Sequence, residues 1–202
     1  MADTPRRMHT PEEYNEFYSG TPPWDIGHPQ AVFQALADAG ELRGKVLDAG
    51  CGTGEHALMA ARIGLDATGI DAAPAAIALA EAKARDRNIA ARFLVHDALR
   101  LSDLGAQFNT VLDSGLFHVF DDRDRRTYVQ NLLAAIAPGG RYFMLCFSER
   151  QPGDGGPRRV TQSEIRESFS DGWRVDSIEA AILQTRLDPS AIQGWFARIT
   201  RV

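Results

Sequence analysis

Cysteine is scarce in this chain of 202 residues, which contains only Cys51 and Cys146. They do not form a C-x-x-C pair, so neither a disulfide framework nor a cysteine-based zinc site is expected. Two reduced thiols in apolar surroundings are typical of a cytoplasmic protein, which is the location we predict. The five histidines are scattered without metal-ligand spacing, and we predict no metal site.

Long apolar runs and an excess of positive charge are also missing. No segment approaches the ~20 apolar residues of a membrane-spanning helix, and the first residues lack the apolar stretch of a signal peptide. The formal net charge is -5 and the pI is about 5.5, whereas a protein that grips a phosphate backbone usually has a basic face. We therefore expect neither a membrane nor a nucleic acid as a partner. The sequence gives no prediction of the oligomeric state.

What the sequence does contain, after residue 44, is a regular alternation of apolar runs and helix-forming segments. Helices are expected from Glu55 to Ile63, Pro74 to Arg87 and Arg123 to Ala137, and Pro138-Gly139-Gly140 predicts a turn. The intervening strands are KVLDAG, DATGID, ARFLVHD, FNTVLDSG and RYFMLCFSE. Such alternation predicts βαβ units and a parallel sheet covered by helices on both faces.

The two ends of the chain complete this α/β pattern. A capping box at Thr10 predicts a helix to about Ser19, a second helix should run from Gln30 to Ala39, and another capping box at Thr161 opens a helix to about Phe169. WRVDSIEAAILQT and GWFARITRV read as antiparallel strands joined by RLDPSAIQ. We predict one domain over 1–202 with a doubly wound, seven-stranded, mostly parallel sheet. It comprises an N-terminal helical lid (1–43), a cofactor-binding core (44–150), and a C-terminal helix and antiparallel hairpin (151–202).

The stretch VLDAGCGTGEH, residues 46–56, indicates which ligand this core binds. Gly50, Gly52 and Gly54 follow the first strand, where a backbone without Cβ atoms can turn tightly and approach a ligand closely. A dinucleotide site would need its third glycine where Glu55 stands, and a carboxylate there would repel a pyrophosphate. Asp48 adds a second negative charge, which favours a sulfonium or ammonium group. The pattern suits an adenosine-like ligand with a cationic tail and no phosphate.

An acid followed by G-x-G-x-G resembles the first motif of the Rossmann-like S-adenosylmethionine-dependent methyltransferases. Asp71 ends the second strand about 20 residues after the glycines, where an acid can accept both ribose hydroxyls. The resemblance implies that Asp97 accepts the adenine amino group, and that the cofactor's methionine part meets the substrate near Ser114 and Gly115. It further implies backbone contacts to the cofactor from residues beside these motifs: Cys51, Ala72 and Ala98.

A second informative stretch is TPPWDIGHPQ, residues 21–30. It resembles a segment of thiol, thiopurine and tellurite-type methyltransferases, and the N-terminus and SGLFHVF are similar to enzymes that methylate heterocyclic toxins. The resemblance implies that Trp24 contacts the cofactor, where an indole can cover a sulfonium cation. Tyr14 and Tyr18, at helical spacing, are candidates for the acceptor pocket or for plain packing.

His118 follows the fourth strand and is the candidate for acid–base catalysis or substrate contact, because its ordinary pKa of ~6.5 allows proton uptake at neutral pH. A purely structural histidine is an equal alternative, since alignment in a dry pocket can drive methyl transfer. We therefore expect in-line transfer of a methyl group from S-adenosylmethionine to nitrogen, oxygen or sulfur of a small, aromatic or heterocyclic molecule. The rival hypotheses are a protein or tRNA methyltransferase, a non-catalytic S-adenosylmethionine-binding module and a nicotinamide-dependent oxidoreductase.

Overall fold

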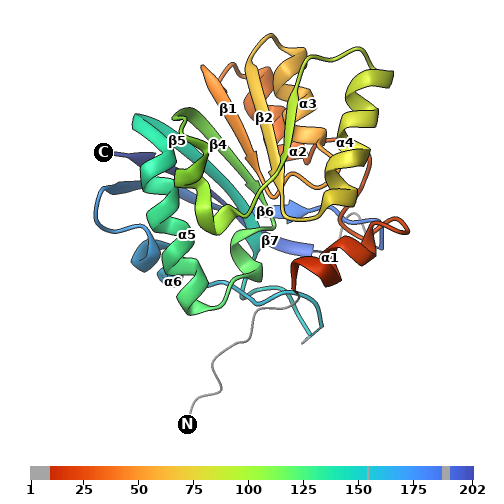
Figure 1. Cartoon of the computed structure of the whole chain (residues 1–202). Helices are drawn as coiled ribbons and strands as arrows, with labels where there is room; N and C mark the ends of the chain where they lie inside the picture. The colour runs from red at the N-terminus through yellow and green to blue at the C-terminus, as the bar shows by residue number, and fades with distance from the viewer. Residues whose placement is uncertain (1–9, 154, 188–191) are drawn as a thin grey trace.

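The computed structural model describes residues 10–153, 155–187 and 192–202. A seven-stranded sheet in the order β3-β2-β1-β4-β5-β7-β6 forms its centre (Figure 1). Its strands are β1 (Lys45–Ala49), β2 (Asp66–Asp71), β3 (Arg92–Val95), β4 (Phe108–Ser114), β5 (Ile136–Phe147), β6 (Trp173–Leu183) and β7 (Ile192–Arg201). The first five pair in parallel, and β7 pairs antiparallel with both β5 and β6. The predicted mostly parallel sheet with a C-terminal antiparallel hairpin is confirmed.

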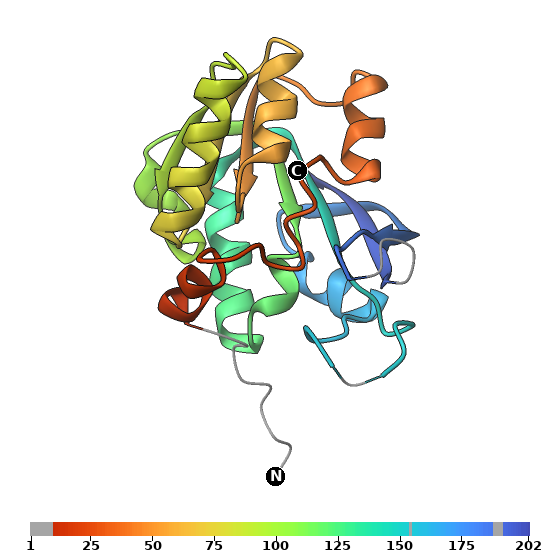
Figure 2. The same ribbon diagram turned by 90° about the vertical axis from the view of Figure 1, so that its right-hand side faces the viewer.

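Helices cover both faces of the sheet (Figures 1 and 2). The elements are α1 (Pro11–Phe17), α2 (Ala31–Asp38), α3 (Glu55–Arg62), α4 (Pro74–Asp86), α5 (Asp122–Ala135) and α6 (Gln162–Ser168), with the 3-10 turns η1 (Ala98–Leu104) and η2 (Phe117–Val119). Both predicted capping boxes form, at Thr10 with Glu13 and at Thr161 with Glu164. Each satisfies two backbone N–H groups that a helix start leaves without partners.

The hydrophobic core has a separate part on each face of the sheet. On one face, fully buried Tyr128 and Leu132 of α5 pack with Tyr142 of β5. On the other, Phe33 of α2 packs against Phe196 of β7 at a ring-centroid distance of 5.9 Å. Since both faces are covered, consecutive residues of the central strands β1 and β4 are buried, rather than every second residue.

The fifth strand begins earlier than predicted. Instead of a turn at Pro138-Gly139-Gly140, α5 passes directly into β5 at Ile136, and the strand includes these three residues. The ladder with β4 shifts register between Phe108 and Thr110, and Gly139 has φ of 75°. In this register residues 137–140 lie opposite the single Asn109, so the proline and two glycines form part of a large bulge of four residues within the strand. The sequence pattern does not distinguish this from a turn. Part of the predicted RLDPSAIQ connection, residues 188–191, lies outside the described residues.

The N-terminal segment leads from α1 to α2 across the carboxyl ends of the parallel strands (Figure 2). Gln30, just before α2, anchors this segment through both ends of its side-chain amide. Its Oε1 accepts from the backbone N–H of Gln184 at 2.8 Å, and its Nε2 donates to the Gln184 carbonyl at 2.9 Å. The segment therefore covers the edge of the sheet where α/β proteins bind their ligands. No helix in the described ranges is long and apolar enough to cross a membrane.

Candidate active site

A cavity of about 620 Å³ opens at the carboxyl ends of the strands. It is walled by the N-terminal segment, by the turns after β1, β2, β3 and β4, and by the segments after β5 and beside β7. Thirteen of the fifteen site residues named from the sequence line it: Tyr14, Tyr18, Trp24, Gly50, Cys51, Gly52, Asp71, Ala72, Asp97, Ala98, Ser114, Gly115 and His118. The structure thus brings together residues spread over more than half of the chain.

The glycine bend after β1 is a backbone cradle. Gly52 has φ of 53° and Gly54 has φ of 87°, both in the left-handed region that favours glycine. A Cβ atom on Gly54 would lie 2.7 Å from the ring of Phe93, so this glycine is required for close packing and does not line the cavity. A Cβ on Gly52 would lie 3.1 Å from the Tyr18 hydroxyl and would intrude on the cavity wall. The cradle is open to a ligand because Gly52 has no side chain.

Asp71 joins this cradle to the end of β2. Its Oδ2 accepts from the backbone N–H of Gly52 and its Oδ1 from that of Ala73, each at 2.9 Å. Burial raises the pKa of the carboxyl, while these two hydrogen bonds act in the opposite direction. A carboxylate has about four lone-pair positions, so two remain for ligand hydroxyls. Asp71 can therefore hold the turn after β2 and bind a ligand at the same time.

Asp97 closes the next turn along the same edge. Its Oδ1 accepts from the backbone N–H of Leu99 at 2.9 Å and caps η1. The side chain is half-buried and its second oxygen makes no hydrogen bond within the described chain, so it can accept one from a ligand on the cavity wall.

Asp48, whose charge was expected to favour a cationic ligand, lies behind the cavity wall. It is 1% exposed and is not part of the cavity wall. Its Oδ2 accepts from the backbone N–H of Ala57 at 3.1 Å, and its Oδ1 lies 3.7 Å from Nδ1 of His56. The free N–H groups at the start of α3 attract a carboxylate, which explains this inward position. Asp48 therefore lies behind the glycine bend and does not contact the cavity directly.

Trp24 stands at the cavity mouth among the aromatic residues of α1. Its indole N–H donates to the hydroxyl of Tyr18 at 3.0 Å, and its ring meets Tyr14 and Phe17 edge-on at centroid distances of 6.0 and 5.2 Å. The residue remains 38% exposed. These contacts fix the indole in place while leaving surface available to a ligand.

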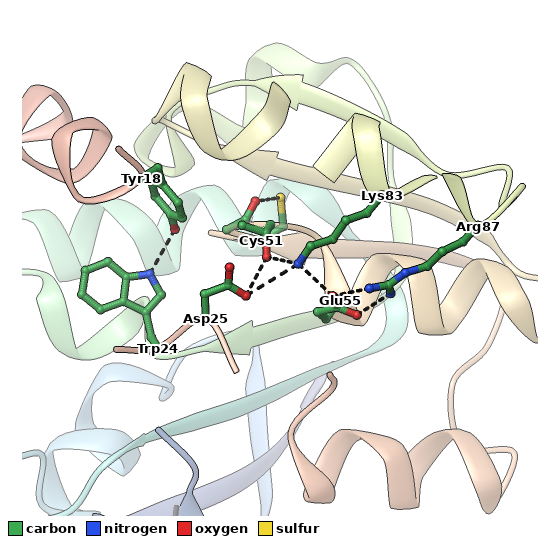
Figure 3. A network of polar contacts seen from close by, with 9 residues as sticks. Tyr18, Trp24, Asp25, Cys51, Glu55, Lys83 and Arg87 are labelled. Atoms are coloured by element: carbon green, nitrogen blue, oxygen red, sulfur yellow. Dashed lines mark hydrogen bonds and ion pairs between the residues drawn. The ribbon is translucent and has the colours of Figure 1, made fainter. Parts of the chain in front are cut away.

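The residue next to Trp24 ties the N-terminal segment to the glycine bend (Figure 3). Asp25 accepts a hydrogen bond from the Thr53 hydroxyl at 2.9 Å, and its Oδ1 lies 3.6 Å from Nζ of Lys83. The Lys83 ammonium also donates to Thr53 Oγ1 at 2.6 Å and to Glu55 Oε1 at 2.8 Å. Lys83 of α4 thus links three separate segments at the cavity rim. Asp25 and Lys83 were not predicted as site residues from the sequence, because their partners are distant in the chain.

Glu55 is neutralised within the protein. Besides Lys83, the guanidinium of Arg87 binds its carboxylate through two hydrogen bonds, of 2.7 and 2.9 Å. Burial alone would raise the pKa of Glu55, but the bonds from Arg87 and Lys83 hold it below its usual value. The free carboxylate that we expected to repel a pyrophosphate is therefore an ion-paired one. The exclusion of a diphosphate rests instead on Asp71 and on the buried charge of Asp48.

His118 reaches the far side of the cavity from η2 and is 4% exposed. Its Nδ1 accepts from the backbone N–H of Phe147 at 3.0 Å. Burial, together with the positive charges of Arg125 and Arg159, lowers its pKa to about 3. The imidazole is therefore neutral at physiological pH, and its environment disfavours proton uptake. Cys51 is also unsuited to nucleophilic chemistry, because burial and the nearby carboxylates raise the pKa of its thiol.

Comparison with known proteins shows the family of this chain. Residues 46–140 match a family profile described as "Methyltransferase domain". A 2-heptyl-1-hydroxyquinolin-4(1H)-one methyltransferase of Mycobacteroides abscessus is 38% identical over 191 residues, covering 93% of this chain and 82% of the relative. The chain belongs to the S-adenosylmethionine-dependent methyltransferases, and S-adenosylmethionine is its cofactor.

Solved structures carry the same fold. One, from work on the conversion of a disulfide bond into a thioacetal group during echinomycin biosynthesis, has a TM-score of 0.87 and 35% identity. The match covers 95% of this chain and 93% of the other. A magnesium protoporphyrin IX methyltransferase from Synechocystis PCC 6803, crystallised with bound S-adenosylmethionine, has a TM-score of 0.67 at 18% identity. Here the match covers 94% of this chain and 80% of the other. At that identity the second similarity concerns the fold alone.

Proposed function

We propose that this enzyme methylates a heteroatom of a small aromatic or heterocyclic molecule by in-line displacement. The observation that carries the proposal is the continuity of the cavity. The half formed by the glycine bend and Asp71 suits a nucleoside, and it opens directly into a half lined by His118, Phe120 and Phe147. Within about 620 Å³, a cofactor and a second small molecule can meet without intervening water.

The residues of the first half fit S-adenosylmethionine. We assign Asp71 to the two ribose hydroxyls, Asp97 to the adenine amino group, and the backbone of the glycine bend to the methionine part. When bound, the cofactor supplies an electrophilic methyl group on a sulfonium centre. Trp24 covers that cation with its π-face, and buried Asp48 adds a favourable field. Held in this way, the methyl group faces Ser114 and Gly115 at the end of β4.

The residues of the second half suit a flat acceptor. Phe120 and Phe147 provide apolar surface. Tyr14 and Tyr18 line the cavity from the N-terminal segment, and the Tyr18 hydroxyl lies beside Gly52, on the cofactor side. The relative from Mycobacteroides abscessus acts on a hydroxyquinolinone, which is the class of acceptor we favour here. Positioning and exclusion of water supply most of the rate, because a sulfonium methyl group needs no further activation. The cytoplasmic location remains a prediction, in keeping with two free, buried cysteines.

A labelled-donor assay tests the proposal. The protein is incubated with methyl-labelled S-adenosylmethionine and separate panels of hydroxyquinolinones, phenols, ring nitrogen heterocycles and thiols, and the products are identified by mass spectrometry. We expect label on one heteroatom of a small aromatic acceptor. Label in cell-extract protein or tRNA, with none in the panels, would contradict the substrate class. Tight donor binding without transfer to any acceptor would indicate a non-catalytic binding module.

A further inference from the structure

The two halves of the cavity differ in charge. Toward β1, β2 and β3 the wall contains the carboxylates of Asp71 and Asp97, which have no cationic partner in the described chain. Asp25 and Glu55 also line this half, but both are paired with Lys83. Toward β4, β5 and β7 the charged or titratable wall residues are His118 and Arg159, with no Asp or Glu among those that the structure describes. The acidic half suits a cationic cofactor. The opposite half carries the positive charge of Arg159 and no described carboxylate, which suits an anion.

His118 presents a proton to this second half. The backbone N–H of Phe147 is an obligatory donor, so the Nδ1 that accepts from it must carry a lone pair. In a neutral imidazole the proton then resides on Nε2. A Cβ atom placed on Gly115 would lie 3.4 Å from that Nε2, which locates the N–H beside the end of β4. This tautomer donates a hydrogen bond toward the acceptor, and its Nε2 has no lone pair with which to act as a base.

Two arginines add positive charge around His118. The Arg159 guanidinium uses all five of its N–H donors on loop carbonyls at 2.7 to 3.3 Å, those of Gln151, Pro152, Gly153, Gly155 and Pro157. No carboxylate in the described chain lies within ion-pair distance of it, so its charge acts on the cavity at a distance. Arg125 of α5 is 4% exposed and reaches Glu164 only at 3.4 Å, while its Nε and Nη2 lack partners in the described part of the protein. Both charges are incompletely compensated, and both act on His118.

Other titratable groups near this half do not offset the charge. Asp113 at the end of β4 is fully buried, does not line the cavity, and accepts hydrogen bonds from the hydroxyls of Tyr142 and Tyr128. The further titratable side chains on the cavity wall are Tyr14, Tyr18, His28, Cys51, His56 and His96, all in the N-terminal segment or beyond β1 to β3.

We propose that the acceptor binds as an oxyanion, that is, as an ionised N-hydroxyl, phenol or enol, with Arg159 attracting its charge and the Nε2–H of His118 donating to its oxygen. This inference rests on the proposed function and narrows it to acidic hydroxyl acceptors. Attack by the oxyanion forms one C–O bond while the C–S electron pair returns to sulfur. Because the acceptor has lost its proton before binding, no proton remains to be removed and no general base is needed.

A binding experiment without turnover tests the inference. Nitrophenols, whose ionised form has its own absorption band, are titrated into the protein saturated with S-adenosylhomocysteine, and the bound phenolate is measured against pH. We expect the pKa of the bound probe to fall by about one unit, equivalent to about tenfold tighter binding of the anion than of the neutral phenol. A bound pKa equal to or above that of the free probe would overturn the proposal, as would the absence of binding.

Variants of Arg159 and Arg150 test whether Arg159 causes the preference for the phenolate. Arg159→Gln should abolish most of the tenfold preference, whereas Arg159→Lys keeps the charge and should keep the preference, although it loses the forked bonds to the loop carbonyls. Arg150→Gln is the matched control, since Arg150 is exposed and does not line the cavity. If Arg159→Gln still bound the phenolate about tenfold more tightly than the neutral phenol, the role given to Arg159 would be overturned.

The pH dependence of turnover separates this inference from the proposed function. For a series of hydroxyl acceptors, the rising limb of kcat/KM should follow the pKa of each acceptor. One fixed midpoint shared by all acceptors would indicate an enzyme base and contradict the inference, while methyl transfer itself would still stand. Phenolate binding with no transfer to any acceptor would instead contradict the proposed function and leave the binding preference intact.

Discussion

Replacing Lys83 by methionine tests how the N-terminal segment is held over the cofactor. The ammonium donates to Thr53 at 2.6 Å and to Glu55 at 2.8 Å, and lies 3.6 Å from Asp25. Charge-assisted hydrogen bonds contribute about 1.5–3 kcal/mol, but the Lys83 side chain is 24% exposed and solvent screens part of this. Arg87 continues to compensate Glu55 in the variant. We therefore expect a loss of about 1–2 kcal/mol in the free energy of unfolding.

The same substitution should weaken cofactor binding. Asp25 keeps its bond from Thr53 but loses the cation beside it, so the segment carrying Trp24 is less firmly docked. We expect the Kd for S-adenosylhomocysteine to rise about three- to tenfold, which corresponds to about 0.6–1.4 kcal/mol. Urea unfolding and calorimetric titration measure the two effects.

The pH dependence of the stability loss has a definite sign. Because the pKa of Glu55 is lowered in the folded protein, its paired carboxylate stabilises the fold above its unfolded pKa, and this stabilisation is lost as the pH falls. The difference between wild type and Lys83→Met should therefore be largest at neutral pH and shrink below about 4.5. Arg85→Met, on the same helix, is the control. Arg85 is 70% exposed and its ion pair with Glu81 is long at 3.9 Å, so a change within about 0.5 kcal/mol is expected. Equal stability and Kd for Lys83→Met and wild type would refute the reasoning.

Three further substitutions have expected outcomes. Trp24→Leu should weaken S-adenosylmethionine by about 0.5–2 kcal/mol more than neutral S-adenosylhomocysteine in calorimetry, and equal losses would exclude a cation–π contribution. Gly54→Ala should destabilise by about 1–3 kcal/mol in urea unfolding, because φ is 87° and the new Cβ would lie 2.7 Å from Phe93; wild-type stability would contradict the packing argument. Burial raises the pKa of Asp113 to about 6 from 3.8, so wild-type stability should fall as the pH rises from about 4 to about 6. Asp113→Asn should remove this fall in stability. Parallel profiles of unfolding free energy against pH for the variant and the wild type would contradict the raised pKa of Asp113.

The sequence predicted the elements whose signals are local. Alternating strands and helices, the two capping boxes and the glycines after β1 each depend on residues within a few positions of one another. Asp71 and Asp97 could be placed on the cavity wall because the carboxyl ends of parallel strands meet at one edge. The positive-φ glycines likewise follow from a tight strand-to-helix turn.

What the sequence missed depends on contacts between distant residues. Glu55 is neutralised by Lys83 and Arg87, which lie 28 and 32 positions away. The tautomer of His118 is set by the backbone N–H of Phe147, 29 positions further along. Asp48 points toward the start of α3 because the N–H of Ala57 donates a hydrogen bond to it. Sequence spacing does not indicate whether such a side chain faces the cavity or the helix. The bulge at Gly139 likewise depends on how β5 aligns with β4.

The central claim is that Asp71 and the glycine bend bind a nucleoside that carries no diphosphate. Thermal unfolding with S-adenosylhomocysteine or with NADH, each added separately, tests this claim most directly. S-adenosylhomocysteine should raise the Tm of the wild-type protein, NADH should leave it unchanged, and Asp71→Asn should lose most of the S-adenosylhomocysteine effect. A rise in Tm with NADH, or full stabilisation of Asp71→Asn by S-adenosylhomocysteine, would contradict the account.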